Sequence, residues 1–278
     1  MVVDKRYLKD VEAIMSHRQD LGDDYWTTPD RRIIKGGPFS MLECAQYLLA
    51  LGMEPDDPVL REVAERTFAA WREDGHFKVY PKGSIFPCQV ATAAQALCRL
   101  GHVADARIQK TLRHLLDTQH GDGGWRCEKF FFGRGPETAF SNPYPTLMVL
   151  DCFRYSDYLN REPALDRAVE FLLAHWDTKL PLGPCHYGIG TLFMQVEYPF
   201  RGYNLFEYVY VLSFYDCAKE DRRFGEALAA LRAKLVDGQV VVERVVPKLA
   251  KFAFCEKGKP SGIATGFYHD ICRNLGEM

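Results

Sequence analysis

Apolar and polar residues alternate along most of this chain with the period of an α-helix. Segments 60–71 and 108–119 each place their large apolar side chains on one face and their charged side chains opposite. Segments 41–51 and 90–100 are apolar on almost every face, which is typical of helices buried on most sides. The pattern therefore predicts a layer of buried helices that is covered by a layer of amphipathic helices.

These helices recur as a repeat. Asp57 precedes one amphipathic helix and Asp74-Gly75 follows it, and Asp105 and Asp122-Gly123 stand at the same offsets in the next block. The first Asp of each block is placed to cap a helix N-terminus, and Asp-Gly is turn chemistry. Each block follows a buried helix that ends in Leu-Gly, where glycine suits the position after the helix. Weaker copies cover 165–176 and 221–238, so the repeat unit is a helix hairpin.

The repeat sets the fold that we expect. Segment 238–246 is the one notable β-branched cluster, and no strand pattern competes with the helices. A closed ring buries its inner helices without an exposed end, which an open solenoid does not. We therefore expect an all-α protein, a single α/α toroid of about five to six helix hairpins. It should form one domain over residues 1–278, with 1–39 as an N-terminal helix and loop that packs on the toroid.

Composition narrows the choice of partner and compartment. Apolar residues make up 47% of the 278 residues and the formal net charge is −2, so nothing favours a nucleic-acid partner. The N-terminus lacks the apolar segment of a signal peptide, and no apolar run reaches the length of a membrane span. The nine cysteines include no CxxC pair, which fits free thiols in a reducing compartment. We expect a cytoplasmic protein without an integral membrane segment.

One motif carries a resemblance to known families. The stretch LLDTQHGDGGW, 115–125, resembles the QW motif of squalene and oxidosqualene cyclases, with Gln119, Gly123 and Trp125 at its Gln, Gly and Trp. The same signature occurs in the β subunits of protein prenyltransferases, and 87–101 and 258–274 are similar to bacterial prenyltransferase-like proteins. Over about 40–275, the resemblance implies an α/α toroid. In this fold the Gln caps an outer helix, and the Trp stacks beneath it and ties successive hairpins together.

The acidic motifs of the cyclases of this fold are absent. Such enzymes protonate an alkene or epoxide with an aspartic acid of raised pKa in a DxDD-type motif. This chain has neither that motif nor a DDxxD diphosphate motif, and its adjacent aspartates are Asp23-Asp24 and Asp56-Asp57. Asp57 is explained as a helix cap. Asp23 and Asp24 are either candidate acids or members of a turn rich in glycine, proline and aromatic residues.

A metal site is the second possibility that the resemblance opens. Tyr268-His269 followed by Cys272 resembles the surroundings of the zinc-binding histidine in the farnesyl-type prenyltransferases, and Cys185-His186 is another candidate ligand pair. Zinc suits Cys and His ligands and lowers the pKa of a bound thiol; iron is the alternative metal. The companion Asp-x-Cys pair of that family is missing. The alternative is that these are ordinary buried thiols and histidines.

Residues near the starts of the buried helices are further candidates, because such starts face one mouth of a toroid cavity. Glu137 and Tyr203 are candidate catalytic residues. Candidate substrate-binding residues are Cys88, Arg126, Arg201 and Tyr208. The alternative is that they are turn, capping and core residues.

Three functions remain open at this point. The first is a transferase or lyase that acts on an isoprenoid or another apolar small molecule in a central cavity lined by aromatic side chains. The second is a metal-dependent enzyme of the same fold with a non-isoprenoid substrate. The third is a binding or scaffold protein without catalysis, because fold does not imply function.

Overall fold

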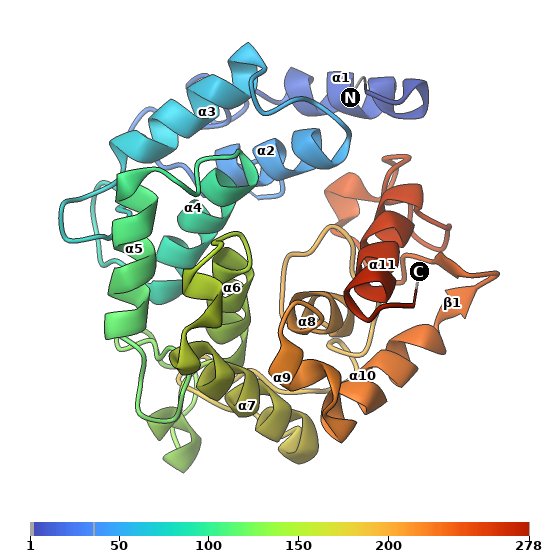
Figure 1. The fold of residues 1–278 in the computed structure, drawn as a ribbon. Helices are drawn as coiled ribbons and strands as arrows, with labels where there is room; N and C mark the ends of the chain where they lie inside the picture. Colours follow the sequence, from blue (N-terminus) through green and yellow to red (C-terminus); the bar gives the residue numbers. More distant parts are fainter. Residues whose placement is uncertain (1–2, 36, 278) are drawn as a thin grey trace. The chain divides into compact units, whose positions relative to one another are not determined.

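Helices dominate the computed structural model, which describes residues 3–35 and 37–277 (Figure 1). Within these residues there are eleven α-helices, four short 3-10 helices and one two-stranded sheet, so the mostly helical class is confirmed. The chain forms two compact units. Unit 1 contains the described residues up to Leu115 together with Phe252–Phe254, and unit 2 contains Leu116–Lys251 and the described residues from Cys255 onward. The toroid and the single domain stay predictions.

Unit 1 is built from the first five α-helices and one 3-10 helix, and α5 continues by two residues into unit 2. Helices α2 and α4 pack on each other and bury most of their side chains, whereas α3 and α5 bury one face. This is the alternation of buried and amphipathic helices that the sequence predicts. The elements are η1 Lys5–Tyr7, α1 Leu8–Ser16, α2 Met41–Ala50, α3 Pro58–Ala69, α4 Pro87–Arg99 and α5 Ala106–Asp117.

The N-terminal helix α1 packs on α2 and is held by a buried carboxylate. Asp10 is only 7% exposed and accepts hydrogen bonds from the backbone N–H groups of Ala253 at 3.1 Å and Phe254 at 2.9 Å. The short segment 252–254 is thereby tied to unit 1, although the rest of its neighbourhood in the sequence belongs to unit 2.

Unit 2 repeats the alternation. All eight residues of α8 and most of α6 are buried, and α7 and α10 pack against them and against each other. The elements are η2 Pro136–Ala139, α6 Pro143–Phe153, η3 Leu159–Arg161, α7 Pro163–Thr178, α8 Leu205–Leu212, α9 Asp216–Lys219, α10 Arg222–Arg232, β1 Leu235–Val236, β2 Gln239–Val240, η4 Pro247–Leu249 and α11 Gly262–Asn274.

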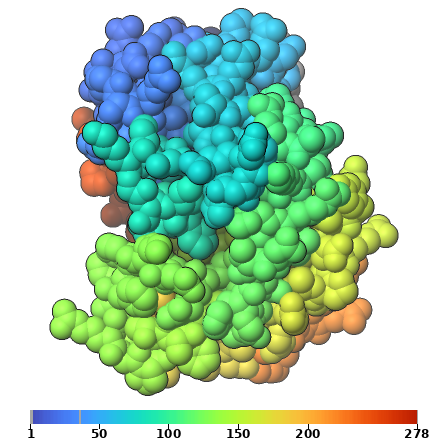
Figure 2. All heavy atoms as spheres, turned by 90° about the vertical axis from the view of Figure 1, so that its left-hand side faces the viewer, coloured from blue at the N-terminus to red at the C-terminus, as the bar shows by residue number. Residues whose placement is uncertain are grey.

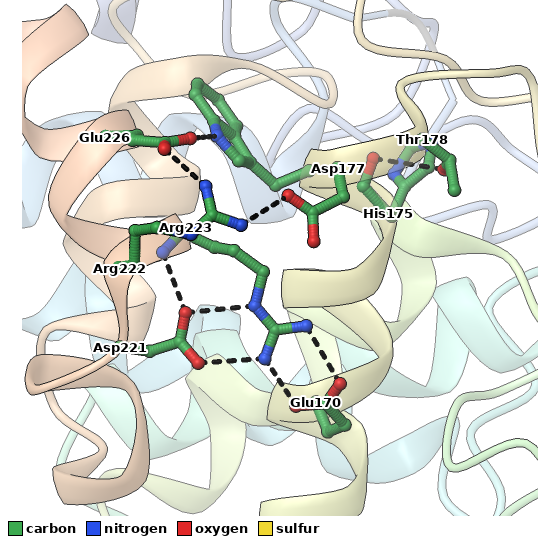
Figure 3. Close-up of polar contacts among 9 residues, drawn as sticks. Glu170, His175, Asp177, Thr178, Asp221, Arg222, Arg223 and Glu226 are labelled. Carbon is green, nitrogen blue, oxygen red and sulfur yellow. Dashed lines mark hydrogen bonds and ion pairs between the residues drawn. The ribbon is translucent and has the colours of Figure 1, made fainter.

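A polar network joins the two amphipathic helices of unit 2 (Figure 3). The Arg223 guanidinium on α10 binds Glu170 on α7 through both terminal nitrogens, at 2.9 and 2.7 Å, and also binds Asp221. The Trp176 indole N–H donates to Glu226 at 3.1 Å. Bidentate Arg–carboxylate pairs fix geometry well. The network therefore sets the register between α7 and α10.

The predicted caps and turns are confirmed. Asp57, Asp105 and Asp221 each accept a hydrogen bond from the backbone N–H two residues later, at 2.8, 2.8 and 2.7 Å. Gly75 and Gly123, at equivalent places in two repeats, have φ of +88° and +95°. Each of these turns packs against the next amphipathic helix of its unit. A Cβ on Gly75 would meet His114 of α5, and a Cβ on Gly123 would meet Arg167 of α7.

The QW-like segment links successive helices of unit 2. The Gln119 side-chain amide donates to the carbonyl of Gly123 and to that of Ala164 in the first turn of α7, both at 2.6 Å. Trp125 is 1% exposed, and its backbone N–H donates to Thr146 of α6 at 3.1 Å. The Gln119 side chain and the Trp125 backbone thus bond to the first turns of α7 and α6, and the stacking role of the tryptophan stays a prediction.

One helix is shorter than the helical pattern of residues 205–217 predicts. The segment 205–217 forms α8 and then breaks before α9, where the Ser213 hydroxyl donates to the Tyr210 carbonyl and Tyr215 donates to Leu150 of α6. Side-chain bonds of this kind compete with the helical ladder. The β-branched segment forms β2, which pairs with β1, and two isolated bridges, from Val241 to Pro260 and from Arg244 to Glu197. No helix among the described residues is long and apolar enough to cross a membrane.

Candidate functional site

The structure divides the candidate residues between the two units. Asp23, Asp24 and Cys88 lie in unit 1. The other candidates lie in unit 2: Arg126, Glu137, Cys185, His186, Arg201, Tyr203, Tyr208, His269 and Cys272.

The two adjacent acids of unit 1 are in unlike settings. Asp24 forms an ion pair with the Arg18 guanidinium, with Nη2 to Oδ2 at 2.6 Å, and that hydrogen-bonded pair lowers the pKa of its carboxyl. An acid that protonates an alkene needs a raised pKa, so this setting favours a structural role for Asp24. Asp23 is exposed, and its Oδ1 accepts the backbone N–H of Asp24 at 2.8 Å, as in a turn. Cys88 is half-buried in the first turn of α4.

Tyr203 lies in a buried aromatic cluster of unit 2. Its hydroxyl is 3.0 Å from His175 Nδ1, and His175 Nε2 lies 2.9 Å from the Leu180 carbonyl. Because the carbonyl only accepts, Nε2 carries the proton and Nδ1 accepts from Tyr203. Burial raises the pKa of Tyr203 and lowers that of His175, so both are neutral and the chain of hydrogen bonds is satisfied. Tyr208 is also buried, and its hydroxyl donates to the Leu172 carbonyl at 3.1 Å.

The residues predicted near the C-terminus do not share one setting. His269 on α11 is exposed, with its ring beside that of Tyr268. Cys272 is 8% exposed, and its thiol hydrogen-bonds the Tyr268 hydroxyl, which also accepts from Arg232 at 3.2 Å. Arg201 is half-buried in the loop before α8.

The loops that carry Cys185, His186, Glu137 and Arg126 come together in unit 2. Segment 182–187 is a tight hairpin, in which the Cys185 backbone N–H donates to the Asn142 side chain at 2.8 Å. Glu137 Oε1 lies 3.7 Å from His186 Nδ1, and backbone N–H bonds, chiefly from Gly135, lower the pKa of the Glu137 carboxyl. These contacts dock the hairpin on the loop that precedes α6.

This docking places Cys185 against a second cysteine. The Cys185 thiol donates a hydrogen bond to the sulfur of Cys127, which also accepts from the backbone N–H groups of Lys129 and Phe130. These bonds, with the nearby charge of Arg126, lower the pKa of Cys127 from an ordinary value of 9.0 to about 6 despite its burial. The lowered pKa favours the thiolate form of Cys127, the form that acts as nucleophile.

An apolar surface adjoins this thiolate. Phe130, Phe131 and Phe132 follow Cys127 in the chain and are 46%, 51% and 68% exposed, an unusual exposure for three consecutive large apolar side chains. Phe130 and Phe132 pack edge to face with ring centres 4.5 Å apart. The loop, in light green, lies open on the face that Figure 2 shows. We call Cys127, Cys185 and these three phenylalanines the thiolate site.

Sequence reasoning selected Cys185 and Arg126 but not Cys127. The available signal was the position of Cys127, two residues after the tryptophan of the QW-like segment, together with the run of phenylalanines that follows it. Among the residues that the structure describes, no group of three or more His, Cys, Asp or Glu side chains is arranged to hold a metal ion. The metal ligands proposed from the sequence stay predictions.

No model of a known protein family matches the chain. No curated protein matches it either.

Proposed function

We propose that this chain is an enzyme of the α/α toroid type found in terpene cyclases and protein prenyltransferases, and that it acts on an apolar small molecule through the Cys127 thiolate. The observation that carries the proposal is the set of three hydrogen-bond donors directed at the Cys127 sulfur. A structural buried cysteine has no need of such donors, because burial alone raises a thiol pKa and makes it inert.

The surroundings of Cys127 support an apolar substrate. The exposed rings of Phe130 to Phe132 belong to the same loop as the sulfur, and the Phe130 backbone N–H donates to it. The thiolate would attack an electrophilic carbon of the substrate, an isoprenoid among the candidates. A carbon–sulfur bond forms as the leaving group departs with its bonding electrons. The donors at the sulfur hold the nucleophile in its charged form before the substrate arrives.

The rest of unit 2 supports this proposal indirectly. The links from α5 to α7 and from α7 to α10 are those of stacked helix hairpins. Such stacking is the local requirement of an α/α toroid, the fold that the QW-like segment suggests. Fold analogy sets no chemistry, so the reaction rests on Cys127.

The proposal is tested by alkylating the full chain with two haloacetamides that share the reactive group but carry an apolar or a polar tail. Peptide mass spectrometry gives the rate at each cysteine near pH 7. Cys217 is the internal comparison, because desolvation of its sulfur and the Asp166 carboxylate raise its pKa to about 12. We expect Cys127 to react first, and faster with the apolar tail.

Two variants distinguish the reactivity of Cys127 from the preference for the apolar reagent tail. Phe131→Ser should remove the preference for the apolar tail while Cys127 still reacts with the polar reagent. Leu192→Ser, which changes an apolar residue of unit 2 outside this loop that is 64% exposed against 51% for Phe131, should leave the preference intact. If Cys127 reacts no faster than Cys217, or shows no preference between tails, the proposed function is wrong.

A further inference from the structure

Unit 1 contains a cleft whose charged lining residues are mostly cations, although the net charge of the whole protein is −2. It measures about 650 Å³ and lies between the loop 23–33, the C-terminal part of α3 and segment 78–81. This volume is within the range of small-molecule sites. The charged lining residues are four cations and two acids, in a chain of net charge −2: Arg31, Arg66, Arg72 and Lys78, with Asp23 and Glu62.

Both acids of the cleft already have partners. The Glu62 carboxylate accepts a hydrogen bond from Arg66 Nε at 2.7 Å, one helical turn away. Asp23 accepts the backbone N–H of Asp24. The Arg66 guanidinium also lies 4.6 Å from the centre of the Tyr25 ring, a cation–π distance. Arg66 is therefore held in place at the wall of the cleft.

Two of the cations that line the cleft have no bonding partner among the described residues. In the part of the chain that the structure describes, the side chains of Arg31 and Lys78 form no hydrogen bond or ion pair. Their backbones are nevertheless fixed, because Arg31 N–H donates to Thr28 and Lys78 N–H donates to Ala70, both at 2.7 Å. Arg31 also has a φ of 59°, a left-handed conformation that is unusual for a non-glycine residue. Backbone of this kind is retained where the surroundings impose it, often at binding sites.

We propose that this cleft binds a small phosphorylated molecule. Guanidinium groups match phosphate oxygens with paired N–H donors, and a lysine adds a compact positive charge. Glu62 is paired with Arg66, and Arg72 Nε lies 3.4 Å from Asp74, so Arg31 and Lys78 are the two cations left for a ligand of two or more negative charges, against the single acid Asp23. Trp71 also lines the cleft, and its indole N–H is already used by Thr111 at 3.2 Å. Its ring is then available to the non-phosphate part of the ligand. The site is independent of the thiolate site in unit 2.

The proposal is tested by titrating the full-length protein with inorganic pyrophosphate by isothermal calorimetry, with citrate and a poly-glutamate peptide as comparison anions. We expect saturable pyrophosphate binding that weakens as salt is raised, because exposed charge interactions are screened. Arg31→Gly removes the guanidinium and suits the positive φ, and Lys78→Gln removes the second free cation. Each should weaken binding by about tenfold, the usual effect of losing one charged hydrogen bond.

Arg61→Gln is the matched control, because Arg61 is an exposed cation of α3 that does not line the cleft. It should leave the dissociation constant unchanged, and circular dichroism of each variant checks the fold. Failure to bind pyrophosphate overturns the proposal, as does equal binding by Arg31→Gly, Lys78→Gln and the wild type. Preference for citrate or for the acidic peptide over pyrophosphate also overturns it, in favour of a carboxylate ligand.

Discussion

The hydrogen bond from Cys185 to Cys127 should control the charge of the thiolate site, and Cys185→Ala tests this directly. The Cys185 thiol is the largest influence that lowers the pKa of Cys127 to about 6. A hydrogen bond to a charged group contributes roughly 1.5 to 3 kcal/mol, and one pKa unit corresponds to about 1.36 kcal/mol. The variant should therefore raise the pKa of Cys127 by roughly one to two units.

The same pKa predicts how the stability of the folded chain depends on pH. A thiol whose folded pKa is about 6, against 9.0 as its ordinary value, binds fewer protons when folded. Its contribution to the free energy of unfolding is fully present above the unfolded pKa and is lost as the pH falls through the folded pKa. By linkage it amounts to about 1 kcal/mol at pH 7 and grows to a few kcal/mol above pH 9.

The assay is chemical denaturation under reducing conditions between about pH 5 and pH 9, with thiolate absorbance followed in the native protein. The difference between the wild type and Cys127→Ser isolates the contribution of Cys127, which should grow with pH. Cys185→Ala should move both this difference and the absorbance midpoint to higher pH. A wild-type thiolate midpoint near 9, or an unchanged midpoint in Cys185→Ala, would refute the reasoning.

Two further predictions concern the packing of each unit. Gly123→Ala should lower the free energy of unfolding by about 3 kcal/mol or more, because its Cβ would come within 2.5 Å of the Arg167 carbonyl at a φ of +95°. Gly238→Ala, which has a φ of +74° and open space around its Cβ, should cost only about 1 kcal/mol in the same denaturation experiment. Asp10→Ala should cost roughly 2 kcal/mol and expose 252–254 to limited proteolysis, because the buried N–H of Phe254 and the part-buried N–H of Ala253 lose their acceptor. Similar losses in the two glycine variants, or a proteolysis pattern unchanged by Asp10→Ala, would contradict these accounts.

The helices could be predicted because their signals are local. The caps at Asp57, Asp105 and Asp221 depend on residues two positions away, and each is confirmed at hydrogen-bond distance. The end of α8 was predicted wrongly for the same reason. Its break involves a bond from Tyr215 to Leu150, a contact between residues far apart in the sequence, and no periodicity reports such a contact.

The candidate sites were harder to predict than the helices, because their residues meet through contacts between distant parts of the sequence. Cys127 meets Cys185 only because the hairpin 182–187 docks through Asn142 on the loop before α6. The cleft of unit 1 likewise joins Arg31 to Lys78 across two loops. The residues of neither pair stand at a recognisable motif spacing in the sequence. Prediction from residue types alone therefore grouped these residues with other partners or missed them. The setting of Asp24 was equally hidden, since Arg18 lowers its pKa through a turn of the backbone.

The links between successive amphipathic helices explain why the QW-like motif is matched in only one repeat. In unit 2 the link from α5 to α7 uses Gln119, whereas the link from α7 to α10 uses Trp176 and Arg223. In unit 1 the indole of Trp71 donates to Thr111 of α5. Each link starts from the end of one amphipathic helix or the beginning of the next, but the side chains differ. The place of the bridge thus recurs while its side chain differs, so a search for the QW-like motif alone misses the links made by Trp71 and Trp176.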